Sequence, residues 1–435
     1  MEQIANIPEA KGKERIVIIG GGFAGLEMAK RIDKKYYQVV LIDKNNYYQF
    51  QPLFYQVATA GLEPSSISYP LRKMFQNQKD FHVRMCEATR LVPAEKQVET
   101  NIGCLTYDYL VIATGCDTNY FGNDALREST FALKSVSEAL LIRNRLLLSL
   151  EEVLSAKDEE EFKELFTFVV IGGGATGVEL AGALADMKKG ILPKDYPELD
   201  FGKMEIHLVD ASPRLLAAMS EKSSLKAART LQKRRVILHQ GVHVEAYDKP
   251  FILLSNGQKI RSRNVFWVAG VTPKPIPGLS ENAYERNRLL VNEFNQVNGY
   301  KDLFALGDTA LFLSPVTPKG HPQVAQVAIQ MARRLAENLN AKATGRLPEP
   351  FVYKDKGSLA TIGRNAAVAD LGKFHFGGPL AWMLWLFVHI MSIVGMRNRV
   401  AVFVDWAWNY FNYDVSLRLL IRPRKSEIYH HEESD

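Results

Sequence analysis

Residues 15–29 read RIVIIGGGFAGLEMA, a short apolar run followed by a glycine turn and the start of a helical pattern. Gly20, Gly22 and Gly25 have the G-x-G-x-x-G spacing, in which the glycines allow a tight turn, close approach to a pyrophosphate and close helix–strand packing. Phosphates favour such a helix N-terminus, where free N–H groups and the helix dipole attract anions. A second apolar run ends in Asp43, 18 residues after Gly25, where a carboxylate can accept from ribose hydroxyls.

The same pattern recurs at residues 166–181, which read FTFVVIGGGATGVELA. Gly172, Gly174 and Gly177 form the second glycine turn, and another apolar run ends in Asp210. Asp210 follows Gly177 by 33 residues, a longer gap than the ~20 usual in this motif. Two such units predict an α/β fold with two Rossmann-like domains and two bound dinucleotides.

An acid at the end of the second strand discriminates against a 2′-phosphate, because like charges would meet there. Asp210 therefore favours NADH over NADPH as the second dinucleotide. Arg214 lies nearby and could accommodate the extra phosphate, so NADPH stays open as an alternative.

Composition and charge narrow the function classes. The chain has 435 residues, is 47% hydrophobic and 23% charged, and carries a formal net charge of +6, which is too small an excess to indicate nucleic acid binding. Cys86, Cys104 and Cys116 are too scattered for the thiol pair of a disulfide reductase, and a reducing compartment is expected. The residues before Arg15 contain no apolar core of a secretion signal, and no His/Cys pattern predicts a metal site.

Two further strand ends connect the motifs into a family pattern. Residues 107–115 end in Ala-Thr114-Gly115, and residues 303–308 end in Gly307-Asp308. By itself the first is an ordinary strand-to-loop turn. The order G-x-G-x-x-G, Ala-Thr-Gly, G-x-G-x-x-G, Gly-Asp resembles that of the two-dinucleotide flavoprotein oxidoreductases. The resemblance implies FAD on the N-terminal unit and a nicotinamide dinucleotide on the inserted one.

The resemblance narrows to the type II NADH:quinone oxidoreductases. Residues 47–64 resemble the segment that follows the first acidic strand in that family, and residues 325–330 fit its AQxxxQ pattern. The family implies contacts with FAD and with NADH from side chains and turns beyond the glycine motifs. The implied FAD contacts are Asp43, Lys44, Thr114, Gly115, Gly307, Asp308, Ala325 and Gln326, and those with NADH are Glu179, Asp210 and Gly270.

Three polar side chains are candidates for a catalytic role. In the family, a glutamate at the position of Glu179 lies near the nicotinamide and the flavin, whereas the plain alternative is a first-turn glutamate bonded to helix N–H groups. Gln326 and Gln330 share a helix face. The resemblance places Gln326 between flavin and quinone and Gln330 along the quinone path. Without the resemblance, a polar helix stripe with no ligand would be the preferred reading.

The C-terminal region predicts an attachment to lipid. Residues 379–396 are almost wholly apolar and, as a helix, would reach ~27 Å against a hydrocarbon core of ~30 Å. Residues 400–413 place Asp405, Asn409 and Asn412 on one stripe of an otherwise apolar helix, which is typical of an interfacial helix. Tryptophans and cations add to this pattern, and the alternatives are a dimer interface or a capping helix pair. They are Trp382, Trp385, Trp406, Trp408, Arg418, Arg422, Arg424 and Lys425.

The sequence therefore predicts an FAD-binding domain formed by residues 12–118 and 291–370, an NADH-binding domain at 119–290, and a membrane-anchoring region at 371–435. The predicted function is hydride transfer from NADH to FAD and on to a membrane quinone without proton pumping. The predicted location is the cytoplasmic face of the cell membrane, with a homodimer open. Alternatives are a soluble NADH oxidase or ferredoxin reductase, or a redox-sensing protein.

Overall fold

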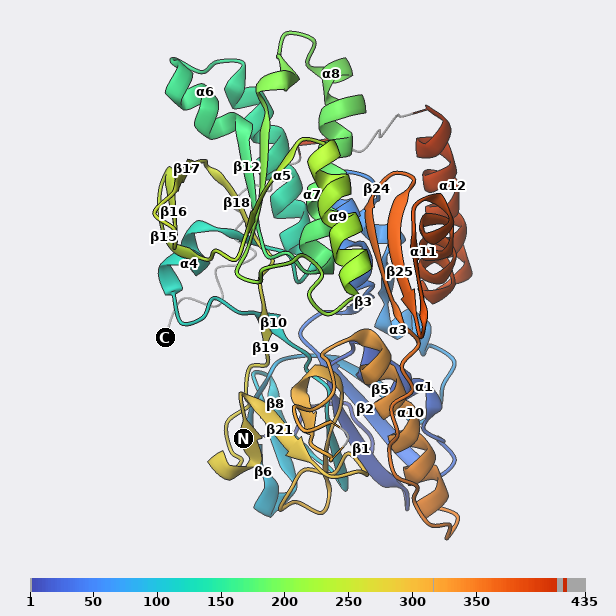
Figure 1. Cartoon of the computed structure of the whole chain (residues 1–435). Helices are drawn as coiled ribbons and strands as arrows, with labels where there is room; N and C mark the ends of the chain where they lie inside the picture. The colour runs from blue at the N-terminus through green and yellow to red at the C-terminus, as the bar shows by residue number, and fades with distance from the viewer. Residues whose placement is uncertain (1, 316, 413–417, 421–435) are drawn as a thin grey trace. The chain divides into compact units, whose positions relative to one another are not determined.

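The structure is a computed structural model that describes residues 2–315, 317–412 and 418–420 (Figure 1). Arg422, Arg424 and Lys425, three of the predicted lipid-facing cations, lie outside these ranges. The chain divides into two compact units, each built from three stretches of sequence. Unit 1 holds Met1–Gln49, Ser68–Asn119 and Val271–Lys356, and unit 2 holds Phe50–Ile67, Tyr120–Gly270 and Gly357–Asp435.

Unit 1 is organised around a five-stranded parallel sheet. Its strands are continuous apolar runs because a parallel sheet is covered on both faces, and helices α1 (Phe23–Arg31) and α10 (Ala325–Lys342) pack against each other beside it. In order across the sheet the strands are β22 (Leu303–Ala305), β9 (Tyr109–Ile112), β1 (Glu14–Ile19), β2 (Tyr37–Asp43) and β5 (Phe81–Met85).

Small antiparallel sheets complete unit 1. One three-stranded sheet consists of β6 (Ala88–Val92), β7 (Gln97–Thr100) and β8 (Gly103–Thr106), and another of β20 (Tyr284–Glu285), β21 (Arg288–Val291) and β23 (Ala310–Phe312), where β21 and β23 run parallel. The two-stranded pairs are β3 (Tyr47–Gln49) with β4 (Ser68–Pro70) and β10 (Asp117–Thr118) with β19 (Val271–Thr272).

Unit 2 repeats the parallel arrangement. Helices α5 (Val136–Val153), α7 (Ala175–Gly190) and α9 (Glu221–Lys233) accompany a second five-stranded parallel sheet. A three-stranded antiparallel sheet of β15 (Val244–Asp248), β16 (Phe251–Leu254) and β17 (Lys259–Arg261) is attached to it. The parallel sheet runs in the order β11 (Phe131–Ala132), β18 (Asn264–Trp267), β12 (Thr167–Ile171), β13 (Glu205–Asp210) and β14 (Val236–Gln240).

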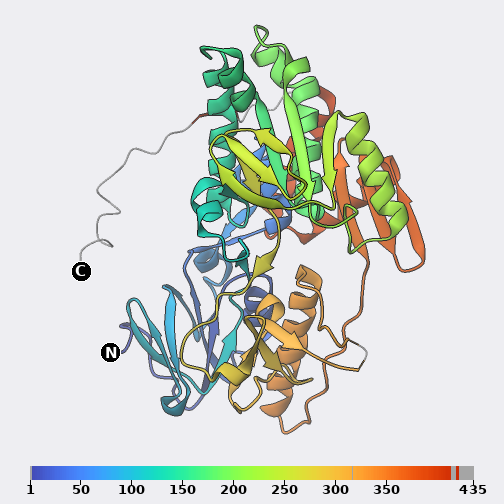
Figure 2. The same cartoon turned by 60° about the vertical axis from the view of Figure 1, so that its left-hand side comes forward.

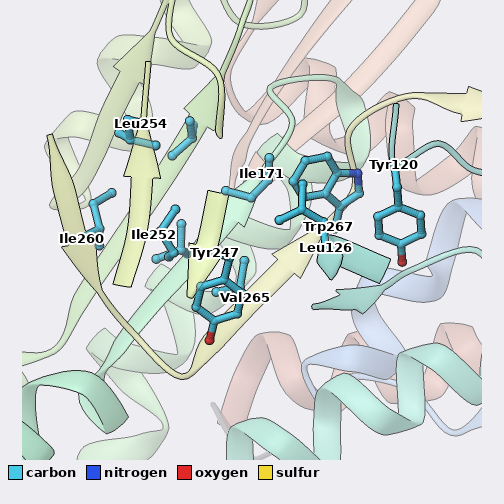
Figure 3. Close-up of a cluster of buried hydrophobic side chains, with 11 residues drawn as sticks. Tyr120, Leu126, Ile171, Tyr247, Ile252, Leu254, Ile260, Val265 and Trp267 are labelled. Atoms are coloured by element: carbon cyan, nitrogen blue, oxygen red, sulfur yellow. The ribbon is translucent and has the colours of Figure 1, made fainter. Parts of the chain in front are cut away.

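An apolar cluster joins the two sheets of unit 2 (Figure 3). Tyr120 stacks on Trp267 with ring centroids 5.8 Å apart, and strand side chains fill the space between the sheets. Burial of this much apolar surface is the main force holding the small sheet on the large one. The cluster consists of Tyr120, Leu126, Val169, Ile171, Val209, Tyr247, Ile252, Leu254, Ile260, Val265 and Trp267.

Unit 2 also contains a segment from the N-terminal part of the sequence. Residues Phe50–Ile67 leave unit 1 after β3 and return to it at β4. Their helix α2 (Phe54–Ala58) packs against α5 and α7 of unit 2, and Phe54 and Val57 are buried there. The segment that carries part of the family resemblance therefore lies beside the second glycine-motif helix.

The C-terminal part of unit 2 begins with an antiparallel sheet that packs on α7 and α9 (Figure 2). Its strands are β24 (Ser358–Gly363), β25 (Ala366–Leu371) and β26 (Phe374–Gly377). Gly182 of α7 lies so close to β24 that an added Cβ would be 2.4 Å from the carbonyl oxygen of Ile362. Asp186, one turn further along α7, accepts from the N–H of Arg364 at 2.7 Å and pairs with Arg234.

Two helices follow this sheet. The first, α11 (Pro379–Ser392), is shorter than the apolar run 379–396 because Ile393 is extended and Gly395 has a positive φ. Its 14 residues reach about 21 Å at the usual helical rise. The second, α12 (Met396–Asn412), follows directly. Among the residues that the structure describes, no helix combines the length and apolar character that crossing a bilayer requires.

Asp405 and Asn409 of the predicted α12 stripe lie toward the protein, whereas Asn412 is exposed. Asn398 donates to the Ser65 carbonyl at 3.2 Å and Asn409 to that of Gly61 at 3.4 Å. Asp405 lies near Glu63, and burial together with this carboxylate raises the pKa of Asp405. The opposite face of the helix is exposed and apolar, so the usual arrangement of a surface helix is inverted. The exposed large hydrophobic side chains of α12 are Met396, Val400, Phe403, Val404, Trp408, Tyr410 and Phe411, beside the exposed polar residues Arg397 and Asn412, and those of α11 are Leu380, Met383, Phe387 and Met391.

We predict that Gly182→Ala destabilises the protein although alanine favours a helix more than glycine does. The added Cβ would meet the backbone oxygen of Ile362, which cannot move as a side chain tip can. Overpacking of this kind costs about 1–3 kcal/mol, more than the helix gains. Thermal melting of the purified variant should show a Tm lower by several degrees, and an unchanged or higher Tm would contradict the close packing of α7 on β24.

Candidate functional site

The first glycine turn, in unit 1, can be built only with glycine. Gly20 has φ +102°, and an added Cβ would lie 2.4 Å from the carbonyl oxygen of Ala113. A Cβ at Gly25 would lie 1.7 Å from the Gly20 oxygen, so the helix approaches the strand end as closely as backbone allows. At Gly22 a Cβ would project into space that the described residues leave open within 4 Å. This open side is where the motif receives a pyrophosphate.

Asp43 closes the same turn from the end of β2. Its carboxylate accepts from the N–H groups of Gly21 and Asn45, each at 2.6 Å. Burial raises the pKa of Asp43, while these two donors oppose the shift. A carboxylate has about four acceptor positions, so oxygen lone pairs stay available for ribose hydroxyls. Lys44, the next residue, is exposed, and its contact with FAD stays a prediction.

The second turn, in unit 2, has the same construction. Gly172 has φ +119° against the backbone of Ala269, and a Cβ at Gly177 would lie 1.7 Å from the Gly172 oxygen. Asp210 accepts from the N–H of Gly173 and, at 2.6 Å, from that of Ser212. Strand β2 ends in an acid in unit 1 and β13 does so in unit 2, as the sequence predicts.

Arg214, the residue that could accommodate the 2′-phosphate of NADPH, is hydrogen-bonded to backbone carbonyls of its own loop. The Arg214 guanidinium donates to the carbonyls of Met219 at 2.9 Å and Ala217 at 2.7 Å. Both bonds direct the side chain toward its own loop. With Asp210 at the strand end and Arg214 held in this way, the second turn favours a free 2′-hydroxyl and hence NADH.

The helices of the predicted cofactor sites begin without a capping side chain, a feature that they share with α2 and α11. Gly22, Gly174 and Val324 precede α1, α7 and α10, and within the described chain no side chain caps these three helices. Helices α4 (Asp124–Ser129), α5, α6 (Glu159–Phe166) and α9 are capped by side chains. Their capping residues are Asn123, Ser135, Asp158 and Ser220. Uncapped N–H groups can bind phosphate or other anionic groups, so the turns fit two dinucleotides.

The Ala-Thr-Gly and Gly-Asp turns meet in unit 1, although the sequence separates them widely. Their strands, β9 and β22, are hydrogen-bonded neighbours. Thr309 Oγ1 lies 3.1 Å from Thr114 Oγ1 and donates to the Gly115 carbonyl at 3.3 Å. Gly307 has φ +67° and packs against Ala328 of α10. The turns that should receive FAD thus converge near the start of α10.

Sequence reasoning missed two residues that hold these turns together. One is Thr309. The other is Gln323, whose amide nitrogen lies 2.9 Å from Cys116 Sγ and 3.2 Å from the Asp308 carbonyl oxygen. The available signals were a hydroxyl directly after the Gly-Asp motif and an amide two residues before the AQxxxQ pattern, but such residues are too common in loops to be distinctive.

Gln326 and Gln330 differ in what their side chains do. The Gln330 amide is paired twice with the Lys354 backbone, donating at 2.9 Å and accepting at 3.0 Å. Gln326, on the first turn of α10, is half-buried, and its side chain has no hydrogen bond among the described residues. The Gln326 amide is therefore available to a ligand, whereas the Gln330 amide is already hydrogen-bonded to the Lys354 backbone. The quinone contacts of both residues stay predictions, as does the NADH contact of Gly270, which is exposed with φ +72°.

Glu179 is buried in unit 2 and is not a first-turn glutamate bonded to its own helix. Its Oε1 accepts from the N–H of Thr361 in β24 at 3.3 Å. Burial raises the pKa of Glu179 to about 8, opposed by Thr361 and by the indole of Trp385 nearby. The Trp385 N–H has no hydrogen bond of ordinary geometry to any described residue. At neutral pH the Glu179 carboxyl therefore holds a proton.

Aromatic residues enclose this carboxyl group. The Tyr55 ring meets the Trp385 ring edge-on at 6.3 Å, and His389 stacks on Trp385 at 3.9 Å. Burial lowers the pKa of His389 to about 4, so its imidazole is neutral at physiological pH. No group of ligands within the described residues could hold a metal ion. Buried titratable groups beside a cofactor-binding helix are typical of a functional site.

The chain matches two protein families. The pyridine nucleotide-disulphide oxidoreductase family matches residues 14–332, and the NDH2 C-terminal domain matches residues 356–412. The structure of NDH2 from Plasmodium falciparum in complex with NADH has the same fold, with a TM-score of 0.85, 23% identity and coverage of 94% of this chain and 100% of that one. Sulfide:quinone oxidoreductase from Aquifex aeolicus is more distant, with a TM-score of 0.69 and 19% identity, covering 94% of this chain and 96% of that one.

Curated relatives extend over most of the chain. The type II NADH:quinone oxidoreductase Ndh of Mycobacterium tuberculosis is 33% identical, covering 92% of this chain and 89% of that protein. NdhA of the same organism is 34% identical, covering 92% and 87%. The mitochondrial internal alternative NAD(P)H-ubiquinone oxidoreductase A1 of Solanum tuberosum is 30% identical, covering 93% and 88%. The chain therefore belongs to the type II NADH:quinone oxidoreductase family.

Proposed function

We propose that this protein transfers a hydride from NADH to FAD and then two electrons to a membrane quinone, without pumping protons. The observation that carries the proposal is the pair of glycine turns, each open at its middle glycine and each closed by an acid at a strand end. Membership of the type II family identifies the electron acceptor as a quinone. FAD, when bound, accepts the hydride and passes the electrons on, while the protein orients the reactants and excludes water.

Each unit supplies its own binding groups. In unit 1, Asp43 meets the ribose of FAD, the start of α1 meets the pyrophosphate, and Thr114, Gly115, Gly307 and Asp308 line the path toward the flavin ring. In unit 2, Asp210 meets the adenosine ribose of NADH and the start of α7 meets its pyrophosphate. The acids, the uncapped helices and the positive-φ glycines support these assignments.

Gln326 is the proposed hydrogen-bond donor to the quinone. Its amide is uncommitted among the described residues and projects from the first turn of α10, directly after the segment that contacts the Asp308 turn. An amide can donate to a quinone carbonyl without placing a net charge beside the flavin. Gln330 lies one turn later on α10 and is also proposed to line the quinone path. Its amide holds the backbone of Lys354 through two hydrogen bonds.

Rapid mixing tests both the function and this role. NADH should bleach the flavin absorption of the purified protein, and a short-chain quinone should restore it much faster than oxygen does. In Gln326→Leu the loss of one hydrogen bond should slow reoxidation by quinone roughly tenfold, with bleaching by NADH little changed. Equal slowing of flavin bleaching and of flavin reoxidation would contradict the assignment of Gln326 to the quinone site. Reoxidation of the unmodified protein by oxygen alone would instead favour a soluble NADH oxidase.

Glu179 is the proposed proton reservoir for reduction of the quinone. Thr361 N–H donates to Oε1, so the proton of the neutral acid lies on Oε2. A buried carboxyl that is protonated at neutral pH can release a proton when negative charge on the reduced acceptor must be neutralised. Its position one turn inside α7, the helix of the NADH turn, supports this role.

The raised pKa of Glu179 has a consequence for stability. The folded protein binds this proton up to about pH 8, whereas an unfolded glutamate releases it near 4.3. Between these values the folded state binds more protons, so stability falls as pH rises, by up to about 1.4 kcal/mol per pH unit. Glu179→Gln should remove this contribution, so its Tm should fall less than that of the unmodified protein between pH 5 and pH 8. If the Tm of the two proteins changed with pH in the same way, the pKa of Glu179 in the folded protein would not be raised.

The exposed apolar faces of α11 and α12 are the proposed lipid-binding surface. Eleven large hydrophobic side chains are exposed on the two helices, among them Phe387, Phe403 and Phe411, while Asn398, Trp406 and Asn409 of α12 bond inward to residues 56–65. A bilayer surface fits such a face better than water does. Arg418 pairs with Asp195 of the same unit, so its charge is turned to the protein. The cytoplasmic face of the membrane fits the supply of NADH and three cysteines that form no disulfide among the described residues.

Outward-facing substitutions test the lipid surface without disturbing the core. The triple variant Phe387→Glu, Phe403→Glu and Phe411→Glu should reduce binding to liposomes at least about 100-fold, because each ring contributes about 1.5–3 kcal/mol when buried. Leu347→Glu, at a fully exposed residue of unit 1, is the matched control. Unchanged cosedimentation of the triple variant would contradict the assignment, and a change only in molecular mass by light scattering would assign the face to a second copy.

A further inference from the structure

A segment that forms neither helix nor strand runs along α10 in unit 1 (Figure 1). It covers residues 346–356, all of which the structure describes, and we call it the strap. The Gln330 amide donates to the Lys354 carbonyl at 2.9 Å and accepts from the Lys354 N–H at 3.0 Å. The Asn338 amide makes the same two bonds with the backbone of Glu349, each at 2.9 Å. Two amides of one helix therefore clamp the strap at two points in the same way.

The spacing of the two clamps fits the geometry of helix and strap. Gln330 and Asn338 belong to one stripe of α10 and are separated along the helix axis by about 12 Å. The five residues of chain between their partners reach about 18 Å when fully extended. The spare length is taken up where Phe351 is buried and its N–H donates to the Glu293 carbonyl at 2.7 Å. The course of the strap is thus fixed at a third point between the clamps.

The strap packs against His321, which lies in the loop before α10. The His321 ring meets the rings of Phe351 and Tyr353 edge-on, with centroids 5.5 Å and 5.4 Å apart. Phe312 at the end of β23 contacts the same imidazole at 5.9 Å. Burial and the charge of Arg288 lower the pKa of His321, so the ring is neutral at physiological pH and packs without an unpaired charge. One side chain therefore joins the strap to the loop.

The same loop holds the Gly-Asp turn that is assigned to FAD. Two residues after His321, the Gln323 amide donates to the Asp308 carbonyl at 3.2 Å. Ala328, in the first turn of α10, packs against Gly307. A continuous series of contacts therefore leads from the clamps through the strap and His321 to the FAD turn, and all of it lies within unit 1.

We propose that Gln330 and Asn338 are positioning residues for the FAD site, because they hold the strap and the strap holds the His321 loop against the turn that binds FAD. The inference rests on the assignment of Gly307 and Asp308 to FAD in the proposed function. It gives the Gln330 amide a task that needs no contact with the quinone. It gives Asn338, which lies outside the AQxxxQ pattern, an equal part in that task.

The clamps should affect how long FAD stays bound. Loss of one clamp removes two hydrogen bonds between neutral groups, each with a modest net contribution, so the strap should loosen and FAD should leave about tenfold faster. Because the series of contacts passes through His321, an interruption at that ring should have the same effect. Loss of a clamp should then add little to it. A general loss of stability would instead give additive effects.

The test is the rate of FAD release from the purified holoprotein after dilution, followed by the fluorescence of free FAD. Gln330→Met and Asn338→Leu should each speed release about tenfold. Asn340→Leu is the matched control on the same helix. The Asn340 amide also donates once and accepts once, but with the Arg31 carbonyl at 3.0 Å and the Asp33 N–H at 2.9 Å, at the far end of α1. This variant should release FAD at the unmodified rate.

His321→Leu tests whether the clamps act through the loop. It should speed FAD release as much as Gln330→Met does, and the double variant should match the two single variants. Far-UV circular dichroism shows whether each variant is folded. Asn338 is buried, so Asn338→Leu is the variant most at risk of misfolding. Methionine is close to glutamine in size, and the pair Gln330→Met and His321→Leu decides the question without the Asn338 variant.

An unchanged rate of FAD release in folded Gln330→Met would overturn the proposal, as would equal acceleration in Asn340→Leu or additive effects in the double variant. Slower reoxidation by quinone in Gln330→Met, with normal release of FAD, would assign the Gln330 amide to the quinone and would also overturn it. Absence of quinone reduction by the unmodified protein would contradict the proposed function alone, since FAD release is measured without turnover.

Discussion

The close approach of backbone to backbone at the glycine turns is the constraint on which the rest of the structure depends. At Gly25 and Gly177 an added Cβ would lie 1.7 Å from the carbonyl oxygen of the first motif glycine, so any side chain there would force helix and strand apart. The same approach leaves the start of each helix facing open space without a capping side chain. One geometric requirement thus sets the strand–helix packing of both units and creates the two anion-binding ends.

Helix α7 carries this constraint from the cofactor turn to the C-terminal sheet. Its first turn belongs to the glycine motif, and one face then presents Glu179 and Gly182 to β24 and Asp186 to Arg364, the residue that follows this strand. Glu179 accepts from the N–H of Thr361, Gly182 lies against the backbone of Ile362, and Asp186 accepts from the N–H of Arg364 while it pairs with Arg234. Any displacement of the C-terminal sheet would change the surroundings of Glu179, because Thr361 and Trp385 both come from that region. The second glycine turn and the surroundings of Glu179 therefore depend on the same helix.

Residues whose role depends on local spacing could be predicted from the sequence. The glycine turns, Asp43 and Asp210 lie as predicted, because turn geometry and strand ends are local properties. The α/β fold and the family are confirmed for the same reason. The transfer of Phe50–Ile67 into unit 2, the link between Thr114 and Thr309, and the enclosure of Glu179 by Tyr55 and Trp385 depend on long-range packing. A single sequence contains no periodic signal for such contacts.

Helix α12 shows how a correct pattern can leave its orientation undetermined. The sequence predicts a stripe of Asp405, Asn409 and Asn412, but a stripe says only that the two faces of a helix differ, not which medium each face meets. Asn412, at the end of the helix, is exposed. In a surface helix of a water-soluble protein, the polar face points toward the water. Here the polar face bonds to the carbonyls and amide of residues 56–65, and the apolar face is exposed. Covering that apolar face with an apolar medium or with another protein surface would stabilise this arrangement, and the hydrogen bonds that hold α12 to the protein are what keep the apolar face outward.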